Sequence, residues 1–483
     1  MQIMVAMKMQ INGKAAGACG GECFEVKNPA TGELIEQVPK GTEEDVSLAV
    51  DAAVSAFEGW ASTSPQQRGM VFYRAAGLVR QRKEELAALL TQEQGKTLSE
   101  ARNELEGFAH VLEYYCGLTG SLRGDFVPVP GNGYAFTVKK PLGVCAAIIP
   151  WNMPALIMGW KIAPALISGN TFVLKPASNT PLTNLTLASI LNEAGLPAGV
   201  LNVVTGPGET TGESLVRNSN VRKISFTGES KTGKRVAELA ASGMKRVALE
   251  LGGSDPMIVC DDADIESAVA GAVRGRFYNC GQTCTAVKRL YVFESVAEEF
   301  TRKLEAGVKK LKVGNGLDKT TDMGPLSNRR QLEFIKELVV EVKEKDEGKI
   351  ITGGKVPAFK GSDKGYFFEP TLVSDVSGDS RLLKEEVFGP LLPIVTVKNL
   401  EEAIGEANRS IYGLGASIWT KNLDRIRAGC EQLNAGIIWV NQHLKVAPEV
   451  PFGGVKESGF GRENGPDILS EYLETRTIMV KTP

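Results

Sequence analysis

The chain has 483 residues, a formal net charge of −2 and eight scattered cysteines. This length suffices for two or three domains with large cores, so the composition is that of an ordinary soluble globular protein. The balanced charge, without a Lys/Arg block, disfavours a nucleic acid or a membrane surface as partner. Scattered cysteines and the lack of a long apolar run indicate a cytoplasmic protein, and with only two histidines (His110 and His443) we expect no metal site.

Residues 43–96 have the period of amphipathic helices. The first apolar face collects Val46, Val50, Ala53, Val54 and Phe57. The stretch from Arg68 to Lys96 continues the period, with Gly95 as its expected stop. After an opening loop, the first hundred residues are therefore predicted to be largely helical.

From about Phe136 the pattern changes to short apolar runs that alternate with helical segments. The apolar runs are "GVCAAIIP", "NTFVLKP", "GVLNVVTG", "RKISFTG" and "KRVALELGG". Strands buried on both faces and joined by crossover helices are typical of a parallel sheet in an α/β fold. A second α/β unit is predicted from about Gly252 into the 450s, with strands in "DPMIVC", "RLYVF", "PLLPIVTV" and "GIIWVN".

No strand is followed by a GxGxxG turn. The runs "TGPGETTG" and "FTGESKTG" come closest, and each alone is a weak sign of a cofactor because Gly-rich turns occur throughout α/β proteins.

Four polar residues follow predicted strands or lie close to one. Asn152 comes after "AAIIPW", Lys175 and Glu250 end their strands, and Cys284 closes "CGQTC". Because the carboxyl ends of parallel strands form the ligand-binding edge of such sheets, we expect a site there. Cys284, Glu250 and Asn152 could supply the thiolate, the base and the oxyanion donor of a covalent mechanism. Taken singly, each has a structural alternative: a buried thiol, a surface carboxylate or a turn-forming amide.

Taken together, these motifs closely resemble the NAD(P)-dependent aldehyde dehydrogenase superfamily, in its hydrolytic branch that does not acylate CoA. The matching runs are "NPATGEL", "EQGKTLSEA", "IIPWNMP", "VLKPASNTPL", "FTGESKTG", "LELGG", "GQTC", "EEVFGP" and "PFGGVKESGFGRENG". The resemblance implies an α/β fold with a Rossmann-like NAD(P)-binding domain (1–118 and 141–250) and an α/β catalytic domain (251–450). It also implies small β oligomerisation segments (119–140 and 466–483) that build a homodimer or homotetramer.

The same resemblance implies the chemistry. Cys284 would add to the aldehyde, the Asn152 amide and the Cys284 N–H would hold the oxyanion, and hydride would leave for the nicotinamide. Glu250 would then activate the water that hydrolyses the thioester. Cys280 would be a packing residue, with a regulatory disulfide to Cys284 as the alternative.

The resemblance also assigns contacts to the cofactor, NADP or NAD. These residues are Ile149, Trp151, Lys175, Ser178, Gly208, Gly228, Glu229, Glu386 and Phe388. Many NAD-preferring members have Glu where this chain has Ser178, and a carboxylate would repel a 2′-phosphate, so we expect NADP⁺ to be used and preferred. Glu229, in place of the usual Ser, puts a negative charge near the phosphates and argues the other way.

By resemblance, the substrate pocket is mostly uncharged. Its residues are Met153, Ile157, Trp160, Thr283, Thr285, Val446 and Phe452. We therefore expect an uncharged aliphatic or aromatic aldehyde. The alternative is a succinate-semialdehyde-type substrate; the missing Arg near Trp160 disfavours it, whereas Lys445 and His443 near the mouth favour it. More remote alternatives are a thiol esterase and a non-catalytic structural protein with the same fold.

Overall fold

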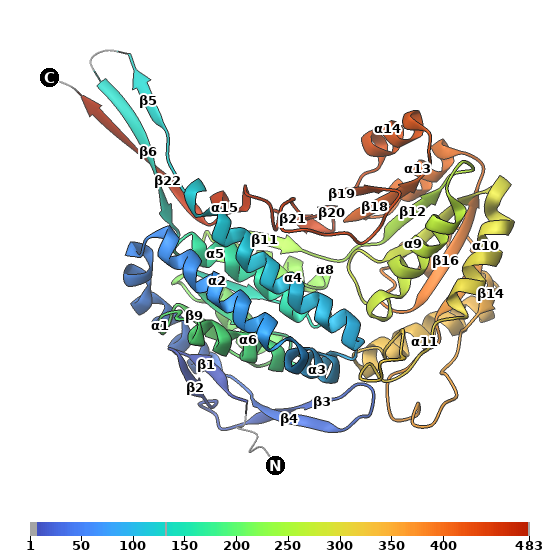
Figure 1. Ribbon diagram of the computed structural model, residues 1–483, viewed down its shortest axis with the longest axis horizontal. Coiled ribbons are helices and arrows are strands. Elements are labelled where there is room, and N and C mark those ends of the chain that lie inside the picture. The colour runs from blue at the N-terminus through green and yellow to red at the C-terminus, as the bar shows by residue number, and fades with distance from the viewer. Residues whose placement is uncertain (1–6, 131–132, 482–483) are drawn as a thin grey trace.

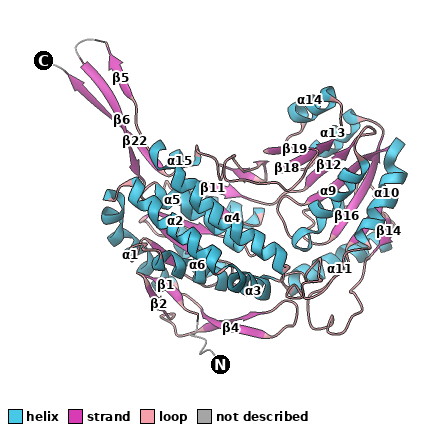
Figure 2. Cartoon of the chain, viewed as in Figure 1, coloured by secondary structure: helices cyan, strands magenta, loops and turns pink. Residues whose placement is uncertain are grey.

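The structure is a computed structural model that describes residues 7–130 and 133–481. The predicted domain segments also include 1–6, 131–132 and 482–483, which lie outside the described residues. Figure 1 shows two lobes built around separate sheets, and a narrow β ribbon that projects from the first lobe. Helices flank the strands of both lobes (Figure 2). Among the described residues, no helix is both long enough and apolar enough to cross a bilayer.

The first lobe contains an eight-stranded sheet whose five central strands are parallel. In spatial order the strands are β2 (Lys14–Ala16), β1 (Met9–Ile11), β9 (Leu201–Val203), β8 (Thr171–Lys175), β7 (Val144–Ile148), β10 (Val221–Thr227), β11 (Arg246–Glu250) and β21 (Gly459–Phe460). The strands β7, β8 and β9 are almost entirely buried because helices cover both faces of the sheet. The parallel sheet predicted from the apolar runs is confirmed.

Helices of this lobe come both from the amino-terminal segment and from the crossovers. They are α1 (Glu43–Ser62), α2 (Pro65–Gln81), α3 (Lys83–Gln94), α4 (Leu98–Gly117), α5 (Pro154–Ile167), α6 (Leu182–Glu193), α7 (Glu213–Arg217) and α8 (Ser230–Ala241). Two details differ from the sequence prediction. The helix expected from Arg68 to Lys96 is interrupted at Arg82, and Gly95 ends its second half with φ 103°. The expected opening loop instead contains the strands β1, β2, β3 (Cys23–Lys27) and β4 (Leu34–Pro39).

The second lobe contains a seven-stranded sheet that is parallel except at the edge strand β14. In spatial order its strands are β14 (Lys349–Thr352), β15 (Thr371–Ser374), β16 (Leu391–Val397), β13 (Val287–Phe293), β12 (Asp255–Val259), β18 (Gly415–Trp419) and β19 (Ile437–Val440). Its helices are α9 (Ile265–Phe277), α10 (Glu294–Val308), α11 (Arg329–Glu344), α12 (Arg381–Lys384), α13 (Leu400–Asn408) and α14 (Leu423–Gln432). The four apolar runs predicted as strands correspond to β12, β13, β16 and β19.

The projecting ribbon joins two distant parts of the chain. The strand β6 (Gly133–Pro141) pairs with β5 (Phe126–Val129) and, over its whole length, with β22 (Leu473–Lys481). Ahead of β22 lies the short helix α15 (Ile468–Glu471). Phe126 and Met479 of this ribbon are 67% and 74% exposed, so the ribbon presents apolar side chains to solvent.

Candidate active site

The segment that carries Cys284 is a tight turn between η3 (Tyr278–Gly281), a short 3-10 helix, and β13. Asn279 and Cys280 both have positive φ, 52° and 56°, and Gly281 follows with φ 72°. A Cβ on Gly281 would collide with the carbonyl of Gly389, so only glycine fits there. Cys280 is buried in the core of the second lobe, as expected of a packing residue, and both thiols are free.

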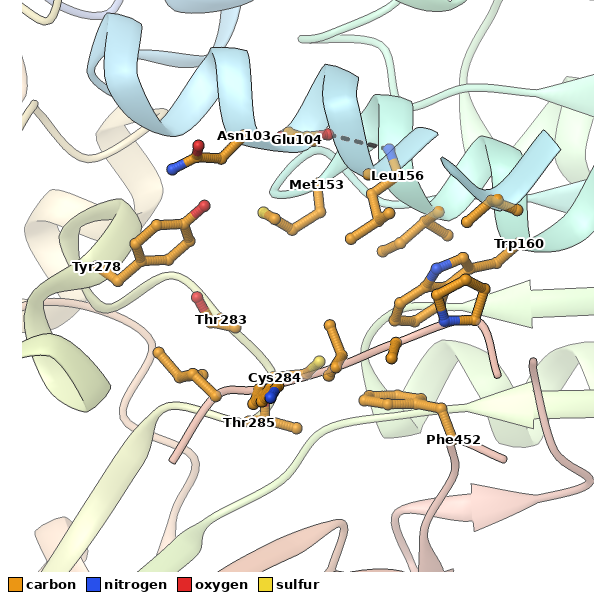
Figure 3. A pocket seen from close by; sticks show the side chains of 18 of the residues that line it. Asn103, Glu104, Met153, Leu156, Trp160, Tyr278, Thr283, Cys284, Thr285 and Phe452 are labelled. Atoms are coloured by element: carbon orange, nitrogen blue, oxygen red, sulfur yellow. Dashed lines mark hydrogen bonds between the residues drawn. The ribbon is translucent and has the colours of Figure 1, made fainter. Parts of the chain in front are cut away.

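Cys284 lies at a cavity of about 290 Å³ (Figure 3). All seven residues predicted for the substrate pocket line this cavity, and Trp160 packs against Phe452 with ring centroids 4.8 Å apart and the ring planes tilted by 48°. The cavity also has walls that sequence reasoning missed. They include Asn103, His110 and Val111 of α4, Leu156 of α5, Arg274 of α9, and Tyr278. The sequence of α4 does not mark its residues as part of a pocket, because this helix reaches the pocket only through its packing on α5.

Asn152 follows β7 and is hydrogen-bonded to the segment that carries Cys284. Its side chain is buried, and its amide donates to the carbonyl of Gln282 at 3.0 Å, which leaves the second amide hydrogen without an acceptor in the described part of the chain. The Asn152 carbonyl accepts from the Lys96 ammonium at 2.8 Å and from the Asn279 amide at 3.0 Å. The backbone of Asn152 is thus fixed independently of its side chain.

Glu250 ends β11 and is 4% exposed. One carboxylate oxygen, Oε2, has no hydrogen-bond partner among the described residues. Burial, assisted by the charge of Glu463, raises the pKa of Glu250 well above its usual range. A buried carboxyl with a raised pKa and a free oxygen is suited to accept a proton.

Several buried or half-buried charges, including that of Glu250, act on the Cys284 thiol. Burial raises the pKa of the Cys284 thiol to about 12, Lys288 opposes this increase, and Asp255, Glu386 and Glu250 add to it. The structure therefore joins Asn152 to the Cys284 segment through Gln282, and the charge of Glu250 acts on the Cys284 thiol.

Beside this centre lies a second group of predicted residues, those assigned to the cofactor. Lys175 ends β8 and is 3% exposed, and among the described residues its ammonium donates only to the carbonyl of Pro176 at 3.0 Å. Burial lowers the pKa of Lys175 to about 8. A buried cation with one backbone acceptor is suited to ribose hydroxyls or a phosphate. Ser178 is half-buried, and its hydroxyl donates to the carbonyl of Gly206 at 3.1 Å.

Near the predicted pyrophosphate position, α8 begins at Ser230 without a side-chain cap, so its first N–H groups are available to an anion. Gly228 precedes this helix, and Glu229 forms an exposed ion pair with Arg330 of α11 at 3.7 Å. Gly208 opens a short helical turn, and a Cβ there would meet nothing within 4 Å, so close packing does not require glycine at this position.

Among the residues predicted to lie near the nicotinamide, Trp151 and Phe388 meet edge to face, with ring centroids 5.4 Å apart. Glu386 accepts from the Lys288 ammonium at 3.0 Å and from the Gly253 N–H at 3.1 Å through the same oxygen, Oε1. Its second oxygen has no hydrogen bond within the described residues, so it can accept from a ligand hydroxyl. The side chain of Ile149 packs in the core of the first lobe, which leaves only its backbone for a ligand contact.

Comparisons with known proteins identify the family of this chain. Residues 17–478 match the model of the aldehyde dehydrogenase family. Human retinaldehyde dehydrogenase 3 is 42% identical over 479 residues, which cover 98% of this chain and 93% of that protein.

Two solved structures have the same fold throughout. The E. coli NADP dependent enzyme has a TM-score of 0.96 at 38% identity, covering 99% of this chain and 98% of that one. A betaine aldehyde dehydrogenase variant from Staphylococcus aureus, in complex with NAD⁺, has a TM-score of 0.95 at 36% identity, covering 99% and 98%. The chain therefore belongs to the aldehyde dehydrogenase family and is an enzyme that oxidises aldehydes with NAD(P)⁺.

Proposed function

We propose that Cys284 is the nucleophile, Asn152 an oxyanion donor and Glu250 the general base of this oxidation. One observation carries the assignment: the thiol lies at the substrate cavity, and the Asn152 amide is hydrogen-bonded two residues away, at Gln282. The thiolate adds to the aldehyde carbon and gives a thiohemiacetal. Its oxyanion is held by the Cys284 N–H and by the free hydrogen of the Asn152 amide.

After hydride loss the substrate is a thioester on Cys284. Glu250 takes a proton from water, the hydroxide attacks the thioester carbon, and the acid leaves as the thiol forms again. Because this residue is present as a base, water and not CoA is the expected acceptor of the acyl group.

The residues of the cofactor cleft fit a dinucleotide. We assign the adenosine ribose to Lys175 and Ser178, the pyrophosphate to the start of α8 beside Gly228, and the nicotinamide ribose to Glu386. The nicotinamide, when bound, supplies the hydride acceptor. Ser178 supports a preference for NADP⁺, because no carboxylate stands there to repel a 2′-phosphate, and Arg330 partly offsets the charge of Glu229.

We infer that residues 1–118 and 141–250 bind the cofactor and that 251–450 form the catalytic domain. The exposed apolar side chains of the projecting ribbon support subunit contacts through 119–140 and 466–483, in a homodimer or homotetramer. The free cysteines support a cytoplasmic location.

The shape of the cavity supports an apolar or aromatic aldehyde as substrate. Trp160, Phe452 and Ile157 form an apolar wall, whereas the cations that line the cavity, Arg274 and Lys445, are exposed residues. A four-carbon semialdehyde bound at Cys284 would leave its carboxylate among apolar side chains, which is unfavourable.

The test is a panel of aliphatic, aromatic and carboxylate-bearing aldehydes, each assayed with NAD⁺ and with NADP⁺ by absorbance of the reduced nucleotide. We expect the highest kcat/KM for an apolar aldehyde with NADP⁺, and no turnover by the Cys284→Ala variant. A preference for succinate semialdehyde, or equal kcat/KM with NAD⁺, would contradict the substrate or the cofactor assignment respectively.

A further inference from the structure

A buried lysine, Lys288, lies directly behind Cys284. It belongs to β13, and its side chain is fully buried. Its three N–H groups have three acceptors: the carbonyl of Cys284 at 2.6 Å, the carbonyl of Thr283 at 3.0 Å and Glu386 Oε1 at 3.0 Å. An ammonium removed from water requires such full pairing, so its position is strongly determined.

The contact with Thr283 bears on the proposed oxyanion site. The Thr283 carbonyl and the Cys284 N–H belong to one planar trans peptide, so they point in opposite directions. Lys288, together with the Ala286 N–H at 3.0 Å from the same carbonyl, therefore fixes where the Cys284 N–H points. Within the described residues this N–H donates to no acceptor, as a donor reserved for a ligand should.

The Lys288 ammonium also makes the Cys284 N–H a stronger hydrogen-bond donor. A positive charge on the carbonyl oxygen of a peptide polarises the whole unit, and its N–H becomes a better donor in a low-dielectric site. Glu386 shares the same ammonium, so the peptide beside the nucleophile and the carboxylate assigned to the nicotinamide ribose are held by one group.

We propose that Lys288 is a positioning residue of the oxidation, whose ammonium orients and polarises the Thr283–Cys284 peptide so that the Cys284 N–H can hold the oxyanion. This inference rests on the proposed role of Cys284. The proposed role gives a function to the buried Lys288 ammonium, whose burial would otherwise only cost desolvation free energy.

Two reactions of the enzyme without nucleotide separate this role from an effect on the thiol. Acylation by p-nitrophenyl acetate passes through an oxyanion, and release of p-nitrophenolate reports the new thioester at Cys284. Alkylation by iodoacetamide displaces iodide from the same sulfur and forms no oxyanion. Both rates depend on the thiolate, so their ratio isolates the oxyanion contribution.

Both rates are measured from pH 6 to 10, because several charges face the thiol. Lys288 lowers the pKa of Cys284, and Asp255, Glu386 and Glu250 raise it. His443 is buried close to Lys288 with its pKa lowered to about 4, so it stays neutral over this range. We expect Lys288→Met to move both pH profiles to higher pH, and to lower the ratio of acylation to alkylation by about tenfold or more at every pH.

Lys223→Met is the matched control, because Lys223 is 1% exposed in β10 and pairs with Glu471 at 3.5 Å, away from the nucleophile. We expect this control to lose stability and keep the wild-type ratio. Lys288→Gln, which keeps an N–H donor without the charge, is measured in parallel in case the methionine variant does not fold. An unchanged ratio in a folded Lys288 variant would overturn the proposal, whereas acylation that survives Cys284→Ala would overturn the role of Cys284 itself.

Discussion

Removal of the Asn152 side chain separates catalysis from stability. In Asn152→Ala the hydrogen bond to the carbonyl of Gln282 is lost, but that carbonyl still accepts from the Asn279 amide at 3.3 Å. The Asn152 backbone keeps its contacts with Lys96 and Asn279. We therefore expect a stability loss of about 1 kcal/mol, as for one ordinary hydrogen bond. Loss of an oxyanion donor, in contrast, lowers kcat by about 10²–10³, or roughly 2.7–4 kcal/mol.

The assay measures kcat at saturating aldehyde and nucleotide, together with the thermal unfolding midpoint. Asn202→Ala is the control: Asn202 is fully buried in β9, its amide donates to the carbonyl of Gly199 at 2.7 Å, and its side-chain oxygen accepts from the Asn12 N–H at 2.8 Å. It should lose at least as much stability and keep its kcat. If folded Asn152→Ala retains kcat within about threefold of wild type, Asn152 donates nothing to the oxyanion and the assignment is refuted.

Other variants test the base, the cofactor, the pocket and the ribbon. Glu250→Gln should give one burst of reduced nucleotide per site and then stall, and undiminished steady-state turnover by this variant would contradict the role of Glu250 as base. In the wild type, thioester hydrolysis should accelerate with pH, because the raised pKa keeps Glu250 protonated at lower pH. Ser178→Glu should lower kcat/KM for NADP⁺ relative to NAD⁺ by about tenfold or more. Trp160→Ala should raise KM for apolar aldehydes by about tenfold, measured by initial rates. Phe126→Asp should reduce the assembly mass in light scattering, whereas Met244→Asp, at a residue 92% exposed, should not.

Much of the architecture could be predicted because its signals are local. The strands β7, β8 and β10 are short apolar runs between helical patterns, and this pattern predicts strands of a buried sheet. Asn152 and Glu250 could be expected at one site for the same reason, since both follow parallel strands of that sheet. The opening strands were missed because β1 and β2 have only three residues each, and because β2 and β3 are largely exposed.

Contributions from distant segments could not be predicted. Val111 and His110 reach the cavity because α4 packs against α5, and nothing in the sequence of α4 marks that face as a pocket wall. Lys288 stands in "AVKRLYVF", where a lysine would ordinarily be expected on an exposed edge. Its full burial follows from the acceptors around it, and these come from the Cys284 turn and from Glu386, almost a hundred residues later.

The reactivity of the site is likewise a property of the assembled fold and not of any motif. The thiol of Cys284 is affected by Lys288 from β13, by Asp255 from β12 and by Glu386 from the segment before β16. Glu250 is affected by Glu463, which is itself paired with Lys161 at 2.6 Å in the core of the first lobe. Because these charges are buried or, for Glu386, largely shielded from solvent, a change in one moves the pKa of its neighbours much more than a surface charge would. A variant at any of them should therefore be interpreted through its pH profile before a direct role in catalysis is assigned.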